Sequence, residues 1–117
     1  MSIEYLKAFA FQQEINEAGQ LWVARSINGI VHAQEIDQTG YSLPVWSNRD
    51  RVVDYLKNAL LVGPRFEPYA ILLEDFSNRW LSDQSKGIKE LQLNPDGKSS
   101  QVLAVTTEEF MAAQAAA

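Results

Sequence analysis

The sequence contains no cysteine and only one histidine, His32. Without cysteine, disulfide scaffolds, zinc–thiolate sites and thiol catalysis are excluded. His32 begins the segment His32-Ala33-Gln34-Glu35, which lacks the second histidine of the zinc-protease pattern, and no serine lies in a G-x-S-x-G elbow. We therefore expect a hydrogen-bonded or exposed strand histidine, and no catalytic residue, metal ligand or cofactor.

Other functional signals are missing too. Neither glycine-rich phosphate-binding motif occurs. The net charge of -5 disfavours nucleic-acid binding, because such surfaces are usually basic. No run approaches the roughly 18 apolar residues of a membrane span, and the N-terminus lacks the basic start and apolar run of a signal peptide. We expect a soluble, cytoplasmic protein that binds neither nucleic acid nor membrane.

The chain has 117 residues, 46% of them hydrophobic, which is typical of one globular domain. We expect residues 1–117 to form that single domain, with residues 111–117 as a fraying tail. Two carboxylate pairs, Asp50 with Asp54 and Glu74 with Asp75, stand in predicted helices. Helix dipoles and solvation explain these pairs, so we interpret neither as an acid–base pair.

Residues 3–18 are predicted to form a helix that ends at Gly19. Its apolar residues lie on two faces, one formed by Ile3, Leu6, Phe9 and Ala10 and the other by Phe11, Ile15 and Ala18. A helix that is apolar on two sides is either enclosed within its own domain or shared with a partner chain.

The remaining pattern predicts strands at 21–25, 30–36, 43–46, 69–73, 88–94 and 101–105, and helices at 47–62, 74–85 and from 107. Asn28-Gly29 and Asp96-Gly97 predict hairpin turns. Ser47 and Thr107 are the predicted N-caps of two helices. This order predicts an α+β fold, a two-layer sandwich in which three to four helices cover a mainly antiparallel sheet of hairpins.

Aromatic and arginine residues gather near the ends of the predicted elements. They are either packing residues or parts of an exposed surface, since Trp, Tyr and Arg are favoured at interfaces. A surface for single-stranded nucleic acid is a third interpretation, which the acidic net charge disfavours. The candidate binding residues are Trp22, Trp46, Ser47, Arg49, Tyr69, Arg79 and Trp80.

Three segments carry a family resemblance. They are Gly19-Gln20-Leu21-Trp22, Leu43-Pro44-Val45-Trp46-Ser47, and Glu67-Pro68-Tyr69-Ala70-Ile71 with Leu73, Phe76, Trp80 and Leu81. With the Asp96-Gly97 hairpin and the Thr-Glu-Glu helix start, they resemble a small bacterial family known as domain of unknown function 2750, over residues 5–111. The resemblance implies no reaction, cofactor or catalytic residue.

Two functional hypotheses follow. The first is a non-enzymatic adaptor or regulatory module whose partner is a protein, including a second copy of itself as a homodimer. The alternative is a small-ligand protein or enzyme with an anion pocket near Trp46, Ser47 and Arg49. In that pocket the Ser47 hydroxyl and the amides of Arg49 and Asp50 would bind the anion at a helix N-terminus.

Overall fold

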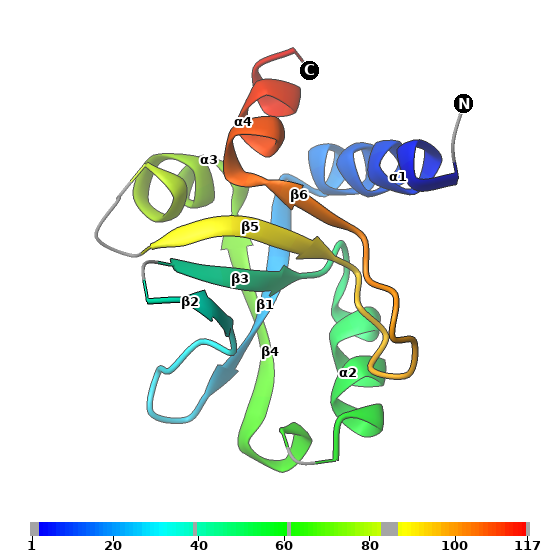
Figure 1. The fold of residues 1–117 in the computed structure, drawn as a ribbon, viewed down its shortest axis with the longest axis vertical. Helices are drawn as coiled ribbons and strands as arrows, with labels where there is room; N and C mark the ends of the chain where they lie inside the picture. Colours follow the sequence, from blue (N-terminus) through cyan, green and yellow to red (C-terminus); the bar gives the residue numbers. More distant parts are fainter. Residues whose placement is uncertain (1–2, 39, 61, 83–86, 117) are drawn as a thin grey trace.

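The computed structural model describes residues 3–38, 40–60, 62–82 and 87–116 (Figure 1). In chain order its elements are α1 (Ile3–Ala18), β1 (Gln20–Ser26), β2 (Gln34–Asp37), β3 (Gly40–Val45), α2 (Arg49–Asn58), the 3-10 turn η1 (Gly63–Arg65), β4 (Phe66–Leu72), α3 (Leu73–Asp75), the π-helical segment η2 (Phe76–Leu81), β5 (Ile88–Leu93), β6 (Ala104–Thr106) and α4 (Thr107–Ala116). The expected α+β class is confirmed, since helices alternate with strands that pair mostly antiparallel. None of the described helices is long and apolar enough to cross a membrane.

The strands form two sheets (Figure 1). β1 and β4 pair antiparallel along their whole lengths, from Gln20 opposite Leu72 to Ser26 opposite Phe66. The other four strands follow the order β2-β3-β5-β6, in which β3 and β5 are parallel and the two outer pairings are antiparallel. Trp22 of β1 and Trp46, just after β3, exchange backbone hydrogen bonds of 2.8 and 2.9 Å, which join the two sheets.

The first predicted hairpin was wrong. A turn does form at Asn28-Gly29, where the Gly29 amide donates to the Ser26 carbonyl at 2.9 Å, but the chain then makes only an isolated bridge between Val31 and Arg25. β2 starts at Gln34 and pairs with β3. β4 is the partner of β1 instead: its seven residues pair along the full length of β1, and it contributes Ile71 to the main hydrophobic cluster and Phe66 to the second one.

The β1–β4 sheet separates two hydrophobic clusters. Leu21, Val23 and Ile71 face the main core, and alternate residues such as Ala24 face a second core against α2, because successive side chains of a strand point to opposite faces. The main core consists of Phe11, Ile15, Leu21, Val23, Leu43, Val45, Ile71, Phe76, Leu81, Leu91, Leu93 and Phe110. The second core consists of Ala24, Trp46 and Val52, with Trp22, Tyr55, Leu56 and Phe66 packed against it.

The first helix agrees with its prediction. α1 spans Ile3–Ala18, and Gly19 follows at φ +71° with its amide donating to the Ile15 carbonyl at 2.8 Å. α2 is shorter than the predicted helix at 47–62, because the Ala59 amide closes its last turn on the Tyr55 carbonyl. Its N-cap is Asn48, and the Gly63-Pro64 pair lies in η1, beyond the end of the helix.

The structure also differs from the predicted helix at 74–85. A short α3 continues as the π-helical η2 up to Leu81, and residues 83–85 of the prediction lie outside the described part. In a π-helix the bonds join residues five apart, which brings such residues to the same side. Phe76 and Leu81 are five apart and both are buried in the main core, so the wider turn lets one segment bury both.

The last hairpin is confirmed, with a shorter second strand than predicted. β5 and β6 pair antiparallel, and Gly97 has φ +80° in their connection. The cap of α4 is Thr106 rather than Thr107: the Thr106 hydroxyl accepts from the Glu109 amide at 3.0 Å, and the Glu109 carboxylate accepts from the Thr106 amide at 2.9 Å. α4 includes residues 111–116, and their fraying in solution stays a prediction.

Candidate functional site

Trp46, a predicted binding residue, lies in the interior. Its side chain has no exposed surface, and its indole Nε1 donates to the Pro95 carbonyl oxygen at 2.8 Å. The Tyr55 ring of α2 packs against it, with ring centres 5.0 Å apart. A buried, hydrogen-bonded indole has no surface to offer a partner in this conformation, so its observed role is packing.

Ser47 is buried beside it and is bound by Asn94. The Ser47 amide donates to Asn94 Oδ1 at 2.9 Å, and Asn94 Nδ2 donates to the Ser47 hydroxyl at 3.1 Å. The predicted N-cap role of Ser47 is wrong: Asn48 Oδ1 accepts from the Arg51 amide at 3.0 Å instead. Because Asn94 binds the Ser47 hydroxyl, that hydroxyl is not free to bind an anion as the alternative hypothesis required.

The remaining predicted binding residues are spread over the molecule. Trp22 is partly buried against the second core, and Arg49 is exposed at the start of α2. Tyr69 packs against the main core and carries the Arg25 guanidinium 3.7 Å above its ring centre. The structure thus brings Trp22, Trp46 and Ser47 together in the interior, apart from the exposed Arg49.

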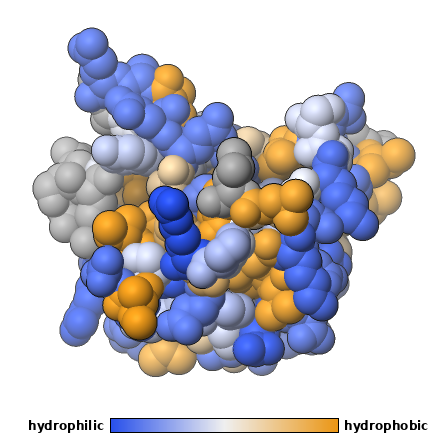
Figure 2. Space-filling view, turned by 90° about the horizontal axis from the view of Figure 1, so that it is seen from below, coloured by the Kyte–Doolittle hydropathy of each residue, from blue (hydrophilic) through white to orange (hydrophobic). Residues whose placement is uncertain are grey.

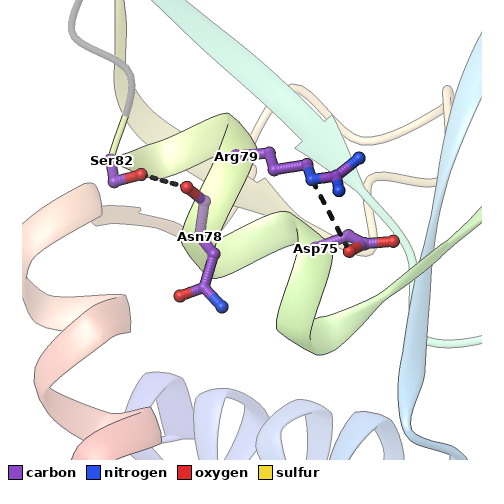
Figure 3. A network of polar contacts seen from close by, with 4 residues as sticks. All are labelled: Asp75, Asn78, Arg79 and Ser82. Atoms are coloured by element: carbon purple, nitrogen blue, oxygen red, sulfur yellow. Dashed lines mark hydrogen bonds and ion pairs between the residues drawn. The ribbon is translucent and has the colours of Figure 1, made fainter.

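Arg79 and Trp80 lie on η2. The Arg79 side chain is 80% exposed and forms an ion pair of 4.0 Å with Asp75, one turn earlier (Figure 3). The same view shows the Ser82 hydroxyl donating to the Asn78 carbonyl, which closes the end of the segment. Trp80 is half-buried, with its ring 5.9 Å from that of Phe76. Binding at Arg49, Arg79 and Trp80 stays a prediction.

His32 is hydrogen-bonded, one of the two alternatives expected from the sequence, but it lies between β1 and β2 rather than in a strand. Its Nε2 lies 2.9 Å from the Tyr55 hydroxyl, and the Phe66 ring meets it edge-on at 5.5 Å. Burial lowers the pKa of His32 and raises that of Tyr55, so both side chains are neutral at pH 7. Within the described residues, no three His, Cys, Asp or Glu side chains are gathered closely enough to hold a metal ion.

A pocket of about 400 Å³ opens between α1, the start of α2 and the connection from β5 to β6. We call it the polar pocket. Four charged side chains line it: Lys7 and Glu14 of α1, Arg51 of α2, and Asp96. Its other lining residues are Ala10, Phe11, Leu93, Asn94, Pro95, Ser99, Gln101, Val102 and Leu103. It lies next to the Trp46–Pro95 and Ser47–Asn94 contacts, but neither Trp46, Ser47 nor Arg49 lines it.

The acids of the polar pocket already have donors. Glu14 Oε1 accepts from Asn48 Nδ2 at 2.6 Å, and Asp96 Oδ1 accepts from the amides of Lys98 and Ser99, both at 2.8 Å. The bonds from Ser99 and then Lys98 lower the pKa of Asp96 and keep it ionised. In contrast, neither Lys7 nor Arg51 has an acid within ion-pair distance among the described residues.

A second depression, the apolar groove, runs between α1 and α4 and has a volume of about 250 Å³. Its walls are mostly hydrophobic and are formed by Tyr5, Ala8, Phe9, Gln12, Leu93, Val105, Glu109, Phe110 and Ala113. Tyr5 and Phe9 stack one turn apart on α1, with ring centres 6.5 Å apart. The side-chain Nε2 of Gln12 is buried and has no hydrogen-bond partner among the described residues, which is unusual for a native interior.

A third, more open depression lies where β1 ends and β4 begins. Figure 2 shows this end of the molecule, where hydrophobic residues are visible among hydrophilic ones. Ile27 in the β1 turn is 94% exposed, and Arg65 and Glu67 add charge to the lining. The lining of this depression thus mixes charged and apolar side chains.

The sequence was compared with known proteins. Residues 8–113 match the model of a family described as protein of unknown function DUF2750. The chain belongs to this family. The match confirms the resemblance stated for residues 5–111 and extends over most of the 117 residues. A search of curated proteins found no match.

For this member of the DUF2750 family, sequence reasoning missed most residues of the polar pocket. Lys7 and Arg51 could not be predicted as pocket residues. A charged residue on one helix gives no sign in the sequence that a second helix lies beside it and forms a pocket with it. Asn94 carried no local signal either, although it has φ +51° and binds Ser47 from 47 residues away. The two apolar faces of α1 are visible in the sequence, but whether both are enclosed could not be predicted; the structure leaves one of them exposed.

Proposed function

We propose that this protein is a non-enzymatic binding module of the bacterial cytoplasm and that it associates with a second copy of itself through the outward face of α1. The observation that carries the proposal is the exposure of large apolar side chains on this one helix. Ile3 is 71%, Leu6 51% and Phe9 50% exposed. Single exposed apolar residues are ordinary, but a contiguous patch marks an interaction surface.

The spacing of these residues supports a helical contact. Ile3, Leu6 and Ala10 follow the three-then-four spacing of helices that pack against each other, and Phe9 lies beside them. Phe11 and Ile15, on the opposite side, anchor α1 in the main core, so the outward face is held on a rigid element. Phe9 also belongs to the wall of the apolar groove, which extends the hydrophobic surface towards α4.

A second copy is a suitable occupant on electrostatic grounds. With a net charge of -5, two copies repel each other, and a contact surface that brings acidic groups together adds to this repulsion. Ile3, Leu6, Phe9 and Ala10 carry no charge, so two such faces meet without opposed carboxylates at their centre. Two-fold symmetry then places the same helix of each copy at the contact, as in most homodimers.

The oligomeric state tests the proposal. Sedimentation velocity over a range of micromolar concentrations should show a species of twice the monomer mass for the wild-type protein. Leu6→Lys should shift the distribution to monomer, because it places a charge at the centre of the contact. Leu60→Lys is the matched control, since Leu60 is 79% exposed outside α1. A monomeric wild-type protein, or equal dissociation by both variants, would refute the proposed contact.

A further inference from the structure

We infer that the polar pocket is a binding site for a small organic anion, a molecule that joins a carboxylate or phosphate group to a compact apolar body. The pocket volume of about 400 Å³ lies within the usual range for small-molecule sites. Its lining is divided almost evenly between polar or charged residues and hydrophobic ones, so it is more polar than most such sites and suits a ligand that has both a charged group and an apolar body.

The charged groups favour an anion over a cation. Lys7 and Arg51 come from different helices, and both lack an acid partner among the residues that the structure describes. Glu14 and Asp96 are already bound by the Asn48 amide group and by two backbone amides, respectively. The two cations of the pocket therefore have no acid partner in the described part of the chain, whereas the oxygens of its two carboxylates that accept these bonds are already engaged by neutral donors.

The balance of charge around the pocket agrees with this preference. Two cationic and two acidic side chains line it, and their sum is zero in a chain whose net charge is -5. Relative to the rest of the acidic surface, the polar pocket is a favourable place for an anion. Arg51 has the planar fork of donors that binds two carboxylate or phosphate oxygens at once.

The apolar part of the lining explains why the ligand needs more than a charge. Phe11, Leu93 and Leu103 are buried or partly buried residues that line the pocket and also belong to the main core or pack against it. A bare inorganic anion leaves this surface in contact with water, whereas an apolar body covers it and gains the corresponding hydrophobic free energy.

The walls are held in place before any ligand binds. The Asn48–Glu14 hydrogen bond of 2.6 Å joins the start of α2 to α1. On the other side, Asn94 and Pro95 are fixed by their bonds to Ser47 and Trp46. Such preorganisation reduces the conformational entropy that binding costs. The polar pocket shares Leu93 with the apolar groove and Ala10 with the proposed contact face of α1. Its four charged lining residues, which carry this inference, are not among the apolar residues that carry the homodimer proposal.

A matched pair of probes tests the inference on the full chain. Pentanoate and pentylammonium each contain five carbon atoms in a straight chain and have opposite charges. Titration of each into 15N-labelled protein, followed by amide chemical shifts, should show saturable shifts at Asn94, Ser99 and Leu103 with pentanoate. Pentyl phosphate should give the same response, and inorganic phosphate a weaker one. Tighter binding of pentylammonium, or no saturable shift with either organic anion, would overturn the inference.

Substitutions test whether the cationic side chains of the polar pocket bind the anionic probe. Lys7→Gln and Arg51→Gln should each weaken pentanoate binding by about tenfold, the loss expected for one charge-assisted contact. Arg49→Gln is the matched control, because Arg49 lies two residues from Arg51 on the same helix and does not line the pocket. Equal weakening by Arg49→Gln would show that general charge, rather than the pocket, attracts the probe, and would also overturn the inference. Unchanged 15N spectra away from the substitution confirm that each variant is folded.

Discussion

Asn48 and Glu14 are joined by a hydrogen bond of 2.6 Å from the amide Nδ2 of Asn48 to Oε1 of Glu14. The same Asn48 side chain accepts from the Arg51 amide through its oxygen. One side chain therefore caps α2 and ties it to α1, at the edge of the polar pocket. This relationship couples the stability of α2 to the position of α1.

Replacement of Asn48 tests both roles. Asn48→Ala removes the cap and the bond to Glu14, so the free energy of unfolding should fall by about 1–2 kcal/mol in urea denaturation. Asn48→Ser keeps a capping oxygen but is too short to reproduce the amide bond, so its loss should be smaller. An alanine variant as stable as the wild-type protein would contradict this account.

Asn94 provides a second test, because its backbone has φ +51° and its side chain binds Ser47. Asn94→Gly loses the side-chain bonds but fits the left-handed backbone, whereas Asn94→Ala loses the bonds and adds backbone strain. The alanine variant should therefore be less stable than the glycine variant by about 1 kcal/mol in urea denaturation. The reverse order of stability would show that backbone strain at position 94 does not determine the difference between the two variants.

Much of the local structure could be predicted from the sequence, since periodicity and turn residues act over short distances. The α1 helix, the Gly19 end and the β5–β6 hairpin are of this kind. The pairing of β1 with β4 could not be predicted in the same way. Asn28-Gly29 does form a turn, but residues 66–72 pair with β1 because they supply apolar side chains to the hydrophobic clusters on both faces of the sheet, which is a tertiary requirement.

Stability should depend on His32 as the pH falls below about 6.5. Burial holds the pKa of His32 below its ordinary value of 6.5 in the folded chain. The unfolded chain therefore takes up the proton first, so the contribution of neutral His32 is present above pH 6.5 and is lost as the pH falls through the lowered folded pKa. The free energy of unfolding of wild-type protein should decrease more steeply over this window than that of His32→Gln. Parallel curves for the two proteins would exclude this role of His32.

The contribution of Glu109 to stability should change at a lower pH than that of His32. The hydrogen bond from the Thr106 backbone, and then that from the Thr106 side chain, lower the pKa of Glu109 from its ordinary value of 4.5. Its stabilising contribution is present above pH 4.5 and is lost as the pH falls through the lowered folded pKa. The difference in stability between wild-type protein and Glu109→Gln should therefore narrow as the pH is lowered from 6 to 3.

Glu108→Gln is the control for this measurement, because Glu108 is the neighbouring exposed acid in the first turn of α4. It removes the same charge near the helix start without affecting the bonds to Thr106. If both variants behave alike at every pH, the helix dipole rather than the Thr106–Glu109 pair accounts for the effect.

The candidate sites were harder to predict from sequence than the fold. Tryptophan and arginine occur both as packing residues and at interfaces. Their presence in a sequence therefore does not show which of these two roles each residue has. Trp46 is buried because a residue far along the chain, Pro95, accepts its indole hydrogen. In the same way, Arg51 rather than Arg49 lines a pocket because of the direction in which α2 meets α1, which a single sequence does not specify.

The contact between two copies is tested most directly by a paramagnetic label. The chain has no native cysteine, so Gln13→Cys gives a single site for a nitroxide on the exposed side of α1. When this labelled copy is mixed with a 15N-labelled copy, the account predicts broadening of the amides of residues 3–10 in the 15N copy. A label at Lys57→Cys on α2 should leave those amides sharp. Sharp α1 amides with both labels at millimolar concentration, or broadening centred on the β1 turn, would contradict the proposed interface.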